Sequence, residues 1–233
     1  QMGVKAPRLI QYRSYEYCAK LSQYMIPIEK FLWSHRHNGF PCFSKGMDSW
    51  KVAALLRDMW TSVTDPVAVL LDHSKFDSSV STPWIEVESH FYSSCFPDGA
   101  LDELMEKQFS NRGWTKGGIK YKCEGRKMSG EYNTSLGDSL INYCILASIS
   151  KTCPSVRLLI NGDDSVAILE KNELQNLVLD KFHEYGMTTT IEWAHIFEHI
   201  EFCQTKPVLL AEGWRMVRDP RRVLSRGTCT VRR

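Results

Sequence analysis

Three aspartates stand where apolar segments end, and carboxylates in such places can hold metal ions. Asp72 directly follows the apolar run 67–71, while Asp163 and Asp164 follow the run 156–160 in a turn of composition Asn-Gly-Asp-Asp. A carboxylate at the end of a buried strand is costly unless a cation or hydrogen bonds satisfy it. Metal ions held by Asp side chains can clamp the attacking and leaving oxygens of a phosphoryl transfer. The residues therefore predict metal-dependent phosphoryl transfer, with an ordinary polar turn as the alternative.

Two further segments accompany these aspartates. Segment 72–77, Asp-His-Ser-Lys-Phe-Asp, places Asp77 five residues after Asp72. Segment 125–134, Gly-Arg-Lys-Met-Ser-Gly-Glu-Tyr-Asn-Thr, is a basic loop with small residues that runs into a predicted helix. Small residues and a helix N-terminus allow the close approach of a phosphate or a sugar. The first segment thus adds a second carboxylate, and the second suits a phosphate or a sugar.

Helices and mostly antiparallel strands must position these residues. The Asn-Gly turn predicts a hairpin around the paired aspartates, and the Gly-Gly pair at 117–118 predicts a second one over 113–123. The other predicted strands cover 8–13, 66–71, 188–193, 200–204, 207–210 and 214–218. The predicted helices begin after Ser14 and Asp48 and cover 82–96, 99–110, 133–149 and 172–185. The mixture predicts the α+β class.

Charge alternates along the chain in blocks. The 29 Lys and Arg against 27 Asp and Glu leave a net charge of +2. This balance excludes a uniformly basic nucleic-acid-coating protein and an acidic disordered tail. Acidic residues dominate 61–110 and 131–210, which hold the aspartates, so we expect a metal-binding acidic centre lying between basic phosphate contacts. Basic residues expected at those contacts are Arg126, Lys127, Arg221, Arg222 and Arg226.

The spacing of the cysteines and the length of the apolar runs limit the classes of protein to which this chain can belong. The eight cysteines form no CxxC pair and match no zinc-finger or small disulfide framework. Scattered cysteines are typical of a reduced, intracellular protein. No signal peptide opens the chain, and its apolar runs are far shorter than the roughly 20 residues that span a bilayer. Since the chain begins at Gln1 and stops at Arg233 after a basic run, we expect a fragment of a longer protein.

An ordered set of segments resembles the motifs of viral RNA-dependent RNA polymerases, in detail those of the tombusvirus-like group of positive-strand RNA viruses. DHSKFD, SGEYNTSLGDSLIN and NGDD are similar to motifs A, B and C. Segment 5–13 resembles the basic fingers motif F, segment 200–208 motif E, and segment 214–218 the strand after it. The resemblance covers nearly the whole chain and implies template-directed transfer of nucleotides from NTPs to an RNA 3′-hydroxyl.

The resemblance also implies a role for each site residue. Asp72, Asp163 and Asp164 would be catalytic and would hold two Mg²⁺ ions, with Mn²⁺ as an alternative. Asp77 would face the ribose of the incoming NTP. The other implied contacts are Lys5, Arg8 and Arg13 with the triphosphate, and Ser129, Gly130, Thr134 and Asp138 with the nascent base pair and sugar.

The implied fold is the palm of a right-hand polymerase, an antiparallel sheet packed on helices, with part of the fingers and the start of the thumb. The divisions would be fingers with motif F (1–65), palm with motif A (66–110), fingers insertion (111–132), palm with motifs B to E (133–218) and truncated thumb (219–233). The implied partners are the RNA template and product strand, NTPs, the missing fingers and thumb segments, and viral replication proteins. The implied location is the host cytoplasm, in a membrane-associated replication complex.

Two positions depart from the family pattern. Asp138 stands where motif B usually has Asn; a carboxylate cannot donate a hydrogen bond as an amide can, and near Asp77 it would tend to share a proton. Segment 186–190 lacks the Lys that motif D often supplies as general acid. His183 or His195 could protonate a leaving group, as could water, so the general acid stays unassigned.

Three alternatives remain. His195, Glu198 and His199 fit the H-x-x-E-H pattern of zinc proteases, which requires a helix that places both histidines on one face. Because the segment lies between two short strand-like runs, we expect a short connecting helix with solvated histidines instead. Gly-Asp-Ser-Leu at 137–140, with segment 180–183, resembles the signatures of GDSL esterases and would make Ser139 a nucleophile. A catalytically inactive RNA-binding module is the third, although all three metal-binding aspartates are present.

Overall fold

The computed structural model describes residues 10–115 and 117–227, so Lys5 and Arg8 lie outside the described residues. The chain forms two compact units: residues 1–30 with 75–141, called unit 1, and residues 31–74 with 142–233, called unit 2. The boundaries fall inside two helices, α1 (Tyr15–Trp33) and α6 (Thr134–Ile149), so each helix contributes to both units. The helices and antiparallel strands confirm the α+β class. The divisions into fingers, palm and thumb stay predictions.

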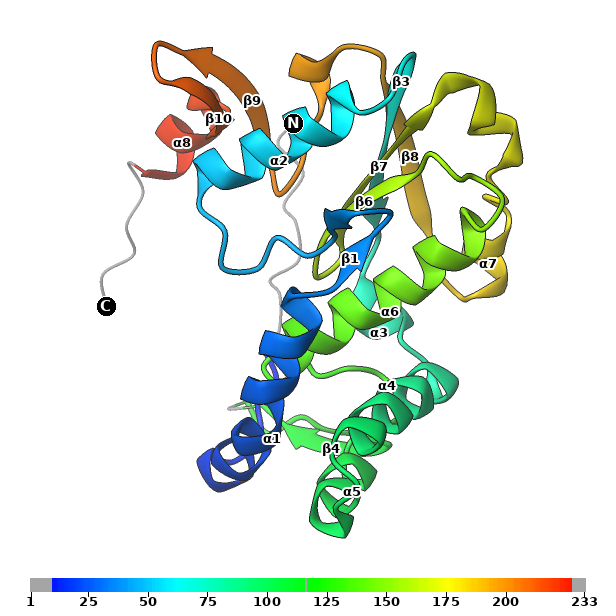
Figure 1. Cartoon of the computed structure of the whole chain (residues 1–233). Helices are drawn as coiled ribbons and strands as arrows, with labels where there is room; N and C mark the ends of the chain where they lie inside the picture. Colours follow the sequence, from blue (N-terminus) through cyan, green and yellow to red (C-terminus); the bar gives the residue numbers. More distant parts are fainter. Residues whose placement is uncertain (1–9, 116, 228–233) are drawn as a thin grey trace. The chain divides into compact units, whose positions relative to one another are not determined.

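Unit 2 is built on a four-stranded antiparallel sheet with the strand order β6-β7-β3-β8 (Figure 1). Its strands are β3 (Pro66–His73), β6 (Arg157–Asn161), β7 (Asp164–Glu170) and β8 (Thr189–Ala194). The central strand β3 pairs with β7 on one side and β8 on the other. Residues 67–71 of β3 are all buried, which explains why this strand reads as an unbroken apolar run rather than an alternating one.

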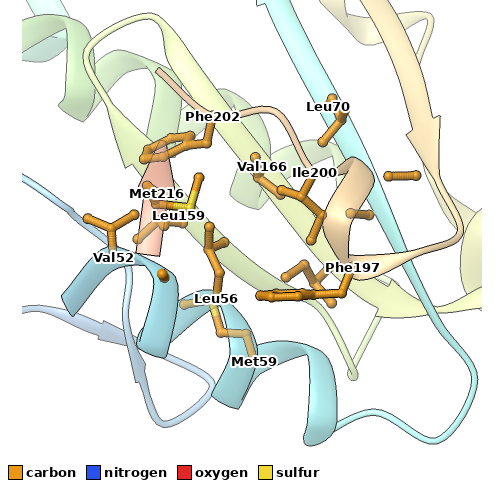
Figure 2. Close-up of a cluster of buried hydrophobic side chains, with 14 of the residues drawn as sticks. Val52, Leu56, Met59, Leu70, Leu159, Val166, Phe197, Ile200, Phe202 and Met216 are labelled. Carbon is orange, nitrogen blue, oxygen red and sulfur yellow. The ribbon is translucent and has the colours of Figure 1, made fainter. Parts of the chain in front are cut away.

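A helix and a hairpin cover this sheet and form the core of unit 2. Helix α2 (Ser49–Thr61) packs against β10 (Gly213–Arg218), which pairs with β9 (Thr205–Leu210). Its predicted start is confirmed, because Asp48 Oδ1 accepts the backbone N–H groups of Trp50 and Lys51. In Figure 2 the buried cluster joins this helix, the sheet and the hairpin. Labelled there are Val52, Leu56, Met59, Leu70, Leu159, Val166, Phe197, Ile200, Phe202 and Met216. Burying each side chain of this kind contributes about 1.5–3 kcal/mol to the stability of the fold. The cluster therefore holds the sheet, and with it the ends of its strands, in place.

Unit 1 is mostly helical. Besides parts of α1 and α6 it contains α3 (Phe76–Ser79), α4 (Thr82–Cys95), α5 (Gly99–Glu106) and the hairpin of β4 (Ser110–Trp114) and β5 (Lys120–Glu124). The hairpin predicted around Gly117 and Gly118 is therefore confirmed. Buried side chains from several helices form its core: Leu21, Met25, Ile85, Tyr92, Leu101, Met105 and Leu136.

The remaining elements are short. They are β1 (Arg36–His37), β2 (Phe40–Pro41), the 3-10 helices η1 (Lys171–Asn176) and η2 (Phe197–His199), α7 (Lys181–Glu184) and α8 (Pro220–Gly227). Across the part of the chain that the structure describes, no helix combines the length and the apolar character needed to cross a membrane.

Three local predictions were wrong. The strand predicted over 8–13 is absent from residues 10–13, which have no regular structure. The helix predicted over 172–185 is split into η1 and α7, because the Asn176 carbonyl accepts from Thr152 and the Val178 N–H donates to Ile149 instead of continuing a helix. The strand predicted over 200–204 is reduced to one bridge, since Cys203 and Gln204 have positive φ angles that turn the chain.

Candidate active site

The paired strands bring the three predicted metal-binding aspartates to one edge of the unit-2 sheet. Leu71 of β3 pairs with Ser165 of the antiparallel strand β7. Asp72 and Asp164 are the next residues along the two strands, so they lie at the same end of this strand pair. Asp164 also pairs with Asn161 across the β6–β7 hairpin, and Asp163 lies in the turn between them. Asp72 and Asp163 are exposed and Asp164 is half-buried. The hairpin prediction is confirmed, and it presents these carboxylates at the surface.

Side chains that the sequence interpretation had not assigned hold this turn. Gly162 has a φ of 65°, a left-handed conformation that favours glycine. Asn142 of α6 donates its Nδ2 hydrogens to the carbonyls of Gly162 (3.0 Å) and Asp163 (3.2 Å). Its Oδ1 faces His73 Nε2 at 3.3 Å, while His73 Nδ1 bonds Thr189 Oγ1 at 2.8 Å. Since His73 adjoins Asp72 in β3, one chain of hydrogen bonds ties the turn to the end of that strand.

Burial and like charge act together on the carboxylates. Burial, then the charges of Asp163 and Asp72, raise the pKa of Asp164 to about 6. The Cys203 thiol donates a hydrogen bond to Asp164 and in turn accepts one from Asn161 Nδ2 at 3.4 Å. Burial, and then the charge of Asp164, raise the pKa of Cys203 to about 12, so this thiol stays protonated. A cation would relieve the repulsion that these like charges create.

The donor set fits a hard divalent cation. Such ions prefer carboxylate oxygens and keep water or substrate oxygens in the remaining positions. Within residues 10–115 and 117–227, no three His, Cys, Asp or Glu side chains are gathered closely enough to form a metal site by themselves. Asp72, Asp163 and Asp164 offer carboxylate oxygens, the type of ligand that such an ion prefers.

In unit 1, the loop before α6 is fixed to α3 and to the start of α1. Backbone N–H groups of Arg126 and Lys127 donate to the carbonyls of Val80 and Asp77, both at 3.0 Å. The Gly130 N–H donates to Gln11 O at 2.7 Å, and a Cβ at Gly130 would overlap that oxygen. Gly130 is thus required for a close backbone approach within the protein.

The predicted sugar contacts have different surroundings. Ser129 is exposed, whereas Thr134 uses its hydroxyl to donate to the carbonyls of Met128 (2.9 Å) and Glu131 (3.0 Å) at the start of α6. Asp138 is buried and hydrogen-bonded to the side chain of half-buried Asp77. The proximity of Asp77 and Asp138 that the sequence suggested is therefore confirmed.

Two basic residues have partners inside the protein. Arg13 bonds Glu131 through Nε and Asn111 through a terminal nitrogen, and it stacks on the Tyr17 ring. Its contact with a triphosphate stays a prediction.

Lys127 was expected among the phosphate contacts, but that expectation was wrong. Its side chain is 1% exposed and is paired with the side chain of Glu88. Arg126 beside it is exposed. Adjacent basic residues alternate between surface and interior here, which charge counting alone does not reveal.

The hydrolase alternatives find no support in the local structure. Ser139 is buried inside α6 and its hydroxyl donates to the Ser135 carbonyl, so it is not presented as a nucleophile. His195 precedes a three-residue 3-10 helix that ends at His199. The pattern therefore lacks the α-helix that would place both histidines on one face. The short connecting helix expected there, with solvated histidines, is confirmed.

Comparison with known proteins gives consistent matches. The family described as viral RNA dependent RNA polymerase matches residues 4–233. The chain is similar to the RNA-directed RNA polymerases of Melon necrotic spot virus (35% identity over 97% of this chain and 30% of the relative) and Tobacco necrosis virus strain A (36%, 97% and 33%). The chain is also similar to the RNA-directed RNA polymerase of Carnation mottle virus, with 35% identity over 92% of this chain and 29% of the relative. The chain thus spans about a third of the length of the curated relatives it matches.

Proposed function

Because this chain belongs to the viral RNA-dependent RNA polymerase family, we propose that it carries the catalytic centre of an RNA-directed RNA polymerase. The 3′-hydroxyl oxygen of a growing RNA forms a bond to the α-phosphorus of an NTP. The bond between that phosphorus and the oxygen bridging to the β-phosphate breaks, and pyrophosphate leaves. The observation that carries this proposal is the β3–β7 register, which brings Asp72 to the hairpin of Asp163 and Asp164.

The aspartates at the sheet edge are assigned to divalent ions. Two Mg²⁺ ions, with Mn²⁺ as the alternative, would supply Lewis-acid stabilisation of the negative charge on the reacting oxygens. Asp72, Asp163 and Asp164 would hold them. The hydrogen bonds of Asn142 and His73 keep the turn in place without using any of the three carboxylates.

The remaining roles follow the family motifs. Asp77 faces the ribose, and Asp138 acts with it. Ser129, Gly130 and Thr134 shape the loop at the nascent base pair, while Lys5, Arg8 and Arg13 neutralise the triphosphate. Units 1 and 2 together would supply the palm and part of the fingers, and α8 the start of the thumb. Template RNA, product RNA and NTPs are the proposed ligands, with other polymerase segments and replication proteins as partners in a membrane-associated complex of the host cytoplasm.

The test is made in the full-length polymerase, with Asp163→Ala as the variant. Asp65→Ala is the matched control, because Asp65 is an exposed acid just before the opposite end of β3. Template-dependent incorporation of labelled NTPs should disappear in the first variant and persist in the second, with equal melting temperatures. Incorporation by Asp163→Ala at the rate of the control would refute the assignment.

A further inference from the structure

A buried cluster of charged groups lies in unit 1 around Asp138. Counted as whole residues, Glu88 of α4 has no exposed surface, and Lys127 and Asp138 are 5% and 6% exposed. Burying one cation with two carboxylates leaves an excess negative charge unless one carboxyl group holds a proton. Asp77 of α3 adds a third carboxyl at the edge of this cluster. The question is therefore which group carries the proton.

Glu88 has the surroundings of an ionised carboxylate. Its Oε1 accepts hydrogen bonds from Tyr92 (2.7 Å) and Asn133 (2.7 Å), and its Oε2 accepts one from Lys127 Nζ (2.5 Å). These three donors stabilise the negative charge of the Glu88 carboxylate. The positive charge of Lys127 is balanced by its contact with Glu88. Burial alone would lower the pKa of Lys127, but contact with negatively charged Glu88 counters burial, and the pKa is raised. Lys127 and Glu88 thus form a complete ion pair.

Asp138 has the surroundings of a neutral carboxylic acid. Its Oδ1 is 3.7 Å from Lys127 Nζ, too far for a hydrogen bond, and this oxygen makes no hydrogen bond within the described part of the chain. Its side chain is hydrogen-bonded to that of Asp77, and two carboxyl groups can share such a bond only when one is protonated. Burial, together with the charges of Asp77 and Glu88, raises the pKa of Asp138 well above its usual range although Lys127 opposes this.

Gly137 lets the helix and the ion pair meet. A Cβ at this position would overlap both Lys127 Nζ and Glu88 Oε1. The residue before Asp138 therefore has to be glycine for α6 to lie against the pair. The backbone of Lys127 also donates to the Asp77 carbonyl, so one residue is linked to both members of the acidic pair.

We propose that the Lys127–Glu88 pair fixes Asp138 as a neutral carboxylic acid, which donates a hydrogen bond to the Asp77 carboxylate and so orients it. Asp138 is then a positioning residue that does what an Asn amide would do at this place, since both are neutral donors of similar size. The consequence for sugar selection rests on the proposed function, because it takes the ribose of an NTP as the ligand of Asp77. The protonation of Asp138 does not depend on that function.

Infrared spectroscopy of the full-length polymerase tests the protonation directly. At pH 7, the spectrum of the wild type minus that of Asp138→Asn should contain the C=O stretch of a protonated carboxylic acid. In Asp77→Asn this band should persist at a shifted frequency, since the bonding partner has changed. Absence of the band from the wild-type difference spectrum would overturn the proposal, whatever the activity of the enzyme.

Kinetics then test the positioning role. Asp138→Asn should keep the wild-type ratio of NTP to dNTP incorporation to within about threefold, whereas Asp138→Ala should lower the ratio about tenfold through loss of one hydrogen bond. A tenfold loss in Asp138→Asn, or none in Asp138→Ala, would refute the role. Wild-type protein that shows the band but makes no RNA would count against the proposed function alone.

Discussion

The carboxylates of the two units differ in their exposure and in their surroundings. In unit 2, Asp72 and Asp163 stand exposed beside half-buried Asp164, and their negative charges help to raise its pKa. In unit 1, Glu88 and Glu131 are buried and paired with Lys127 and Arg13. Carboxylates that the protein neutralises itself serve its structure, whereas we propose that the aspartates at the strand ends bind an external cation. On the proposed function, this difference distinguishes the aspartates proposed to be catalytic from the acids that stabilise the fold.

The largest expected effect is on activity, from Asp72→Asn in the full-length polymerase. RNA synthesis should fall at least about 1000-fold, equivalent to about 4 kcal/mol in activation free energy, because the variant lacks a proposed metal ligand. Stability should stay the same or rise slightly, since an exposed like charge is removed. Initial rates and melting curves provide the two measurements, with Asp65→Asn as the control at the other end of β3. A clear loss of stability would contradict the comparison.

The opposite behaviour is expected for Lys127→Met. Removing one partner of a buried ion pair should destabilise the protein by about 3–5 kcal/mol, because Glu88 is left as an uncompensated buried charge. The double variant Lys127→Met/Glu88→Gln should recover part of that loss. Urea denaturation followed by tryptophan fluorescence measures both. A single variant as stable as the wild type would mean that Lys127 is not the counter-charge of Glu88.

Gly137→Ala tests the fit of α6 against the pair. The added methyl group has no space beside Lys127 and Glu88, so we expect a loss of about 1–3 kcal/mol, as for an overpacked core. Gly99→Ala in the same unit meets nothing within 4 Å and should be neutral or slightly stabilising. Equal unfolding midpoints in urea for the two variants would rule out the close contact.

The smallest expected effect comes from Asn142→Ala, which removes the bonds to the turn of unit 2. Leaving the Gly162 and Asp163 carbonyls without this donor should cost about 1–2 kcal/mol. Faster hydrogen exchange at the β6–β7 turn, measured by mass spectrometry, should accompany it. Exchange at the β4–β5 turn of unit 1 is the internal reference. Unchanged exchange at both turns would show that Asn142 does not hold the aspartate hairpin.

Much of the fold was predictable because its signals are local. The Asn-Gly turn, the apolar run before Asp72 and the cap at Asp48 each act over a few neighbouring residues, and the structure has all three. The segment 172–185 failed for a complementary reason. Its carbonyl and N–H groups near Asn176 bond to residues at the end of α6 and just beyond it, which no local pattern reveals.

The sequence by itself determined the α+β class, the order of the family motifs and the identity of the aspartates at the strand ends. Tertiary structure decided which charges face solvent and which are neutralised inside the protein. Lys127 and Glu88 are 39 positions apart in the sequence, and Arg13 and Glu131 are 118 apart. Pairing at such distances sets the burial of a charge and therefore its protonation, so Asp138 could be located from its motif, but its surroundings could only be read from the fold.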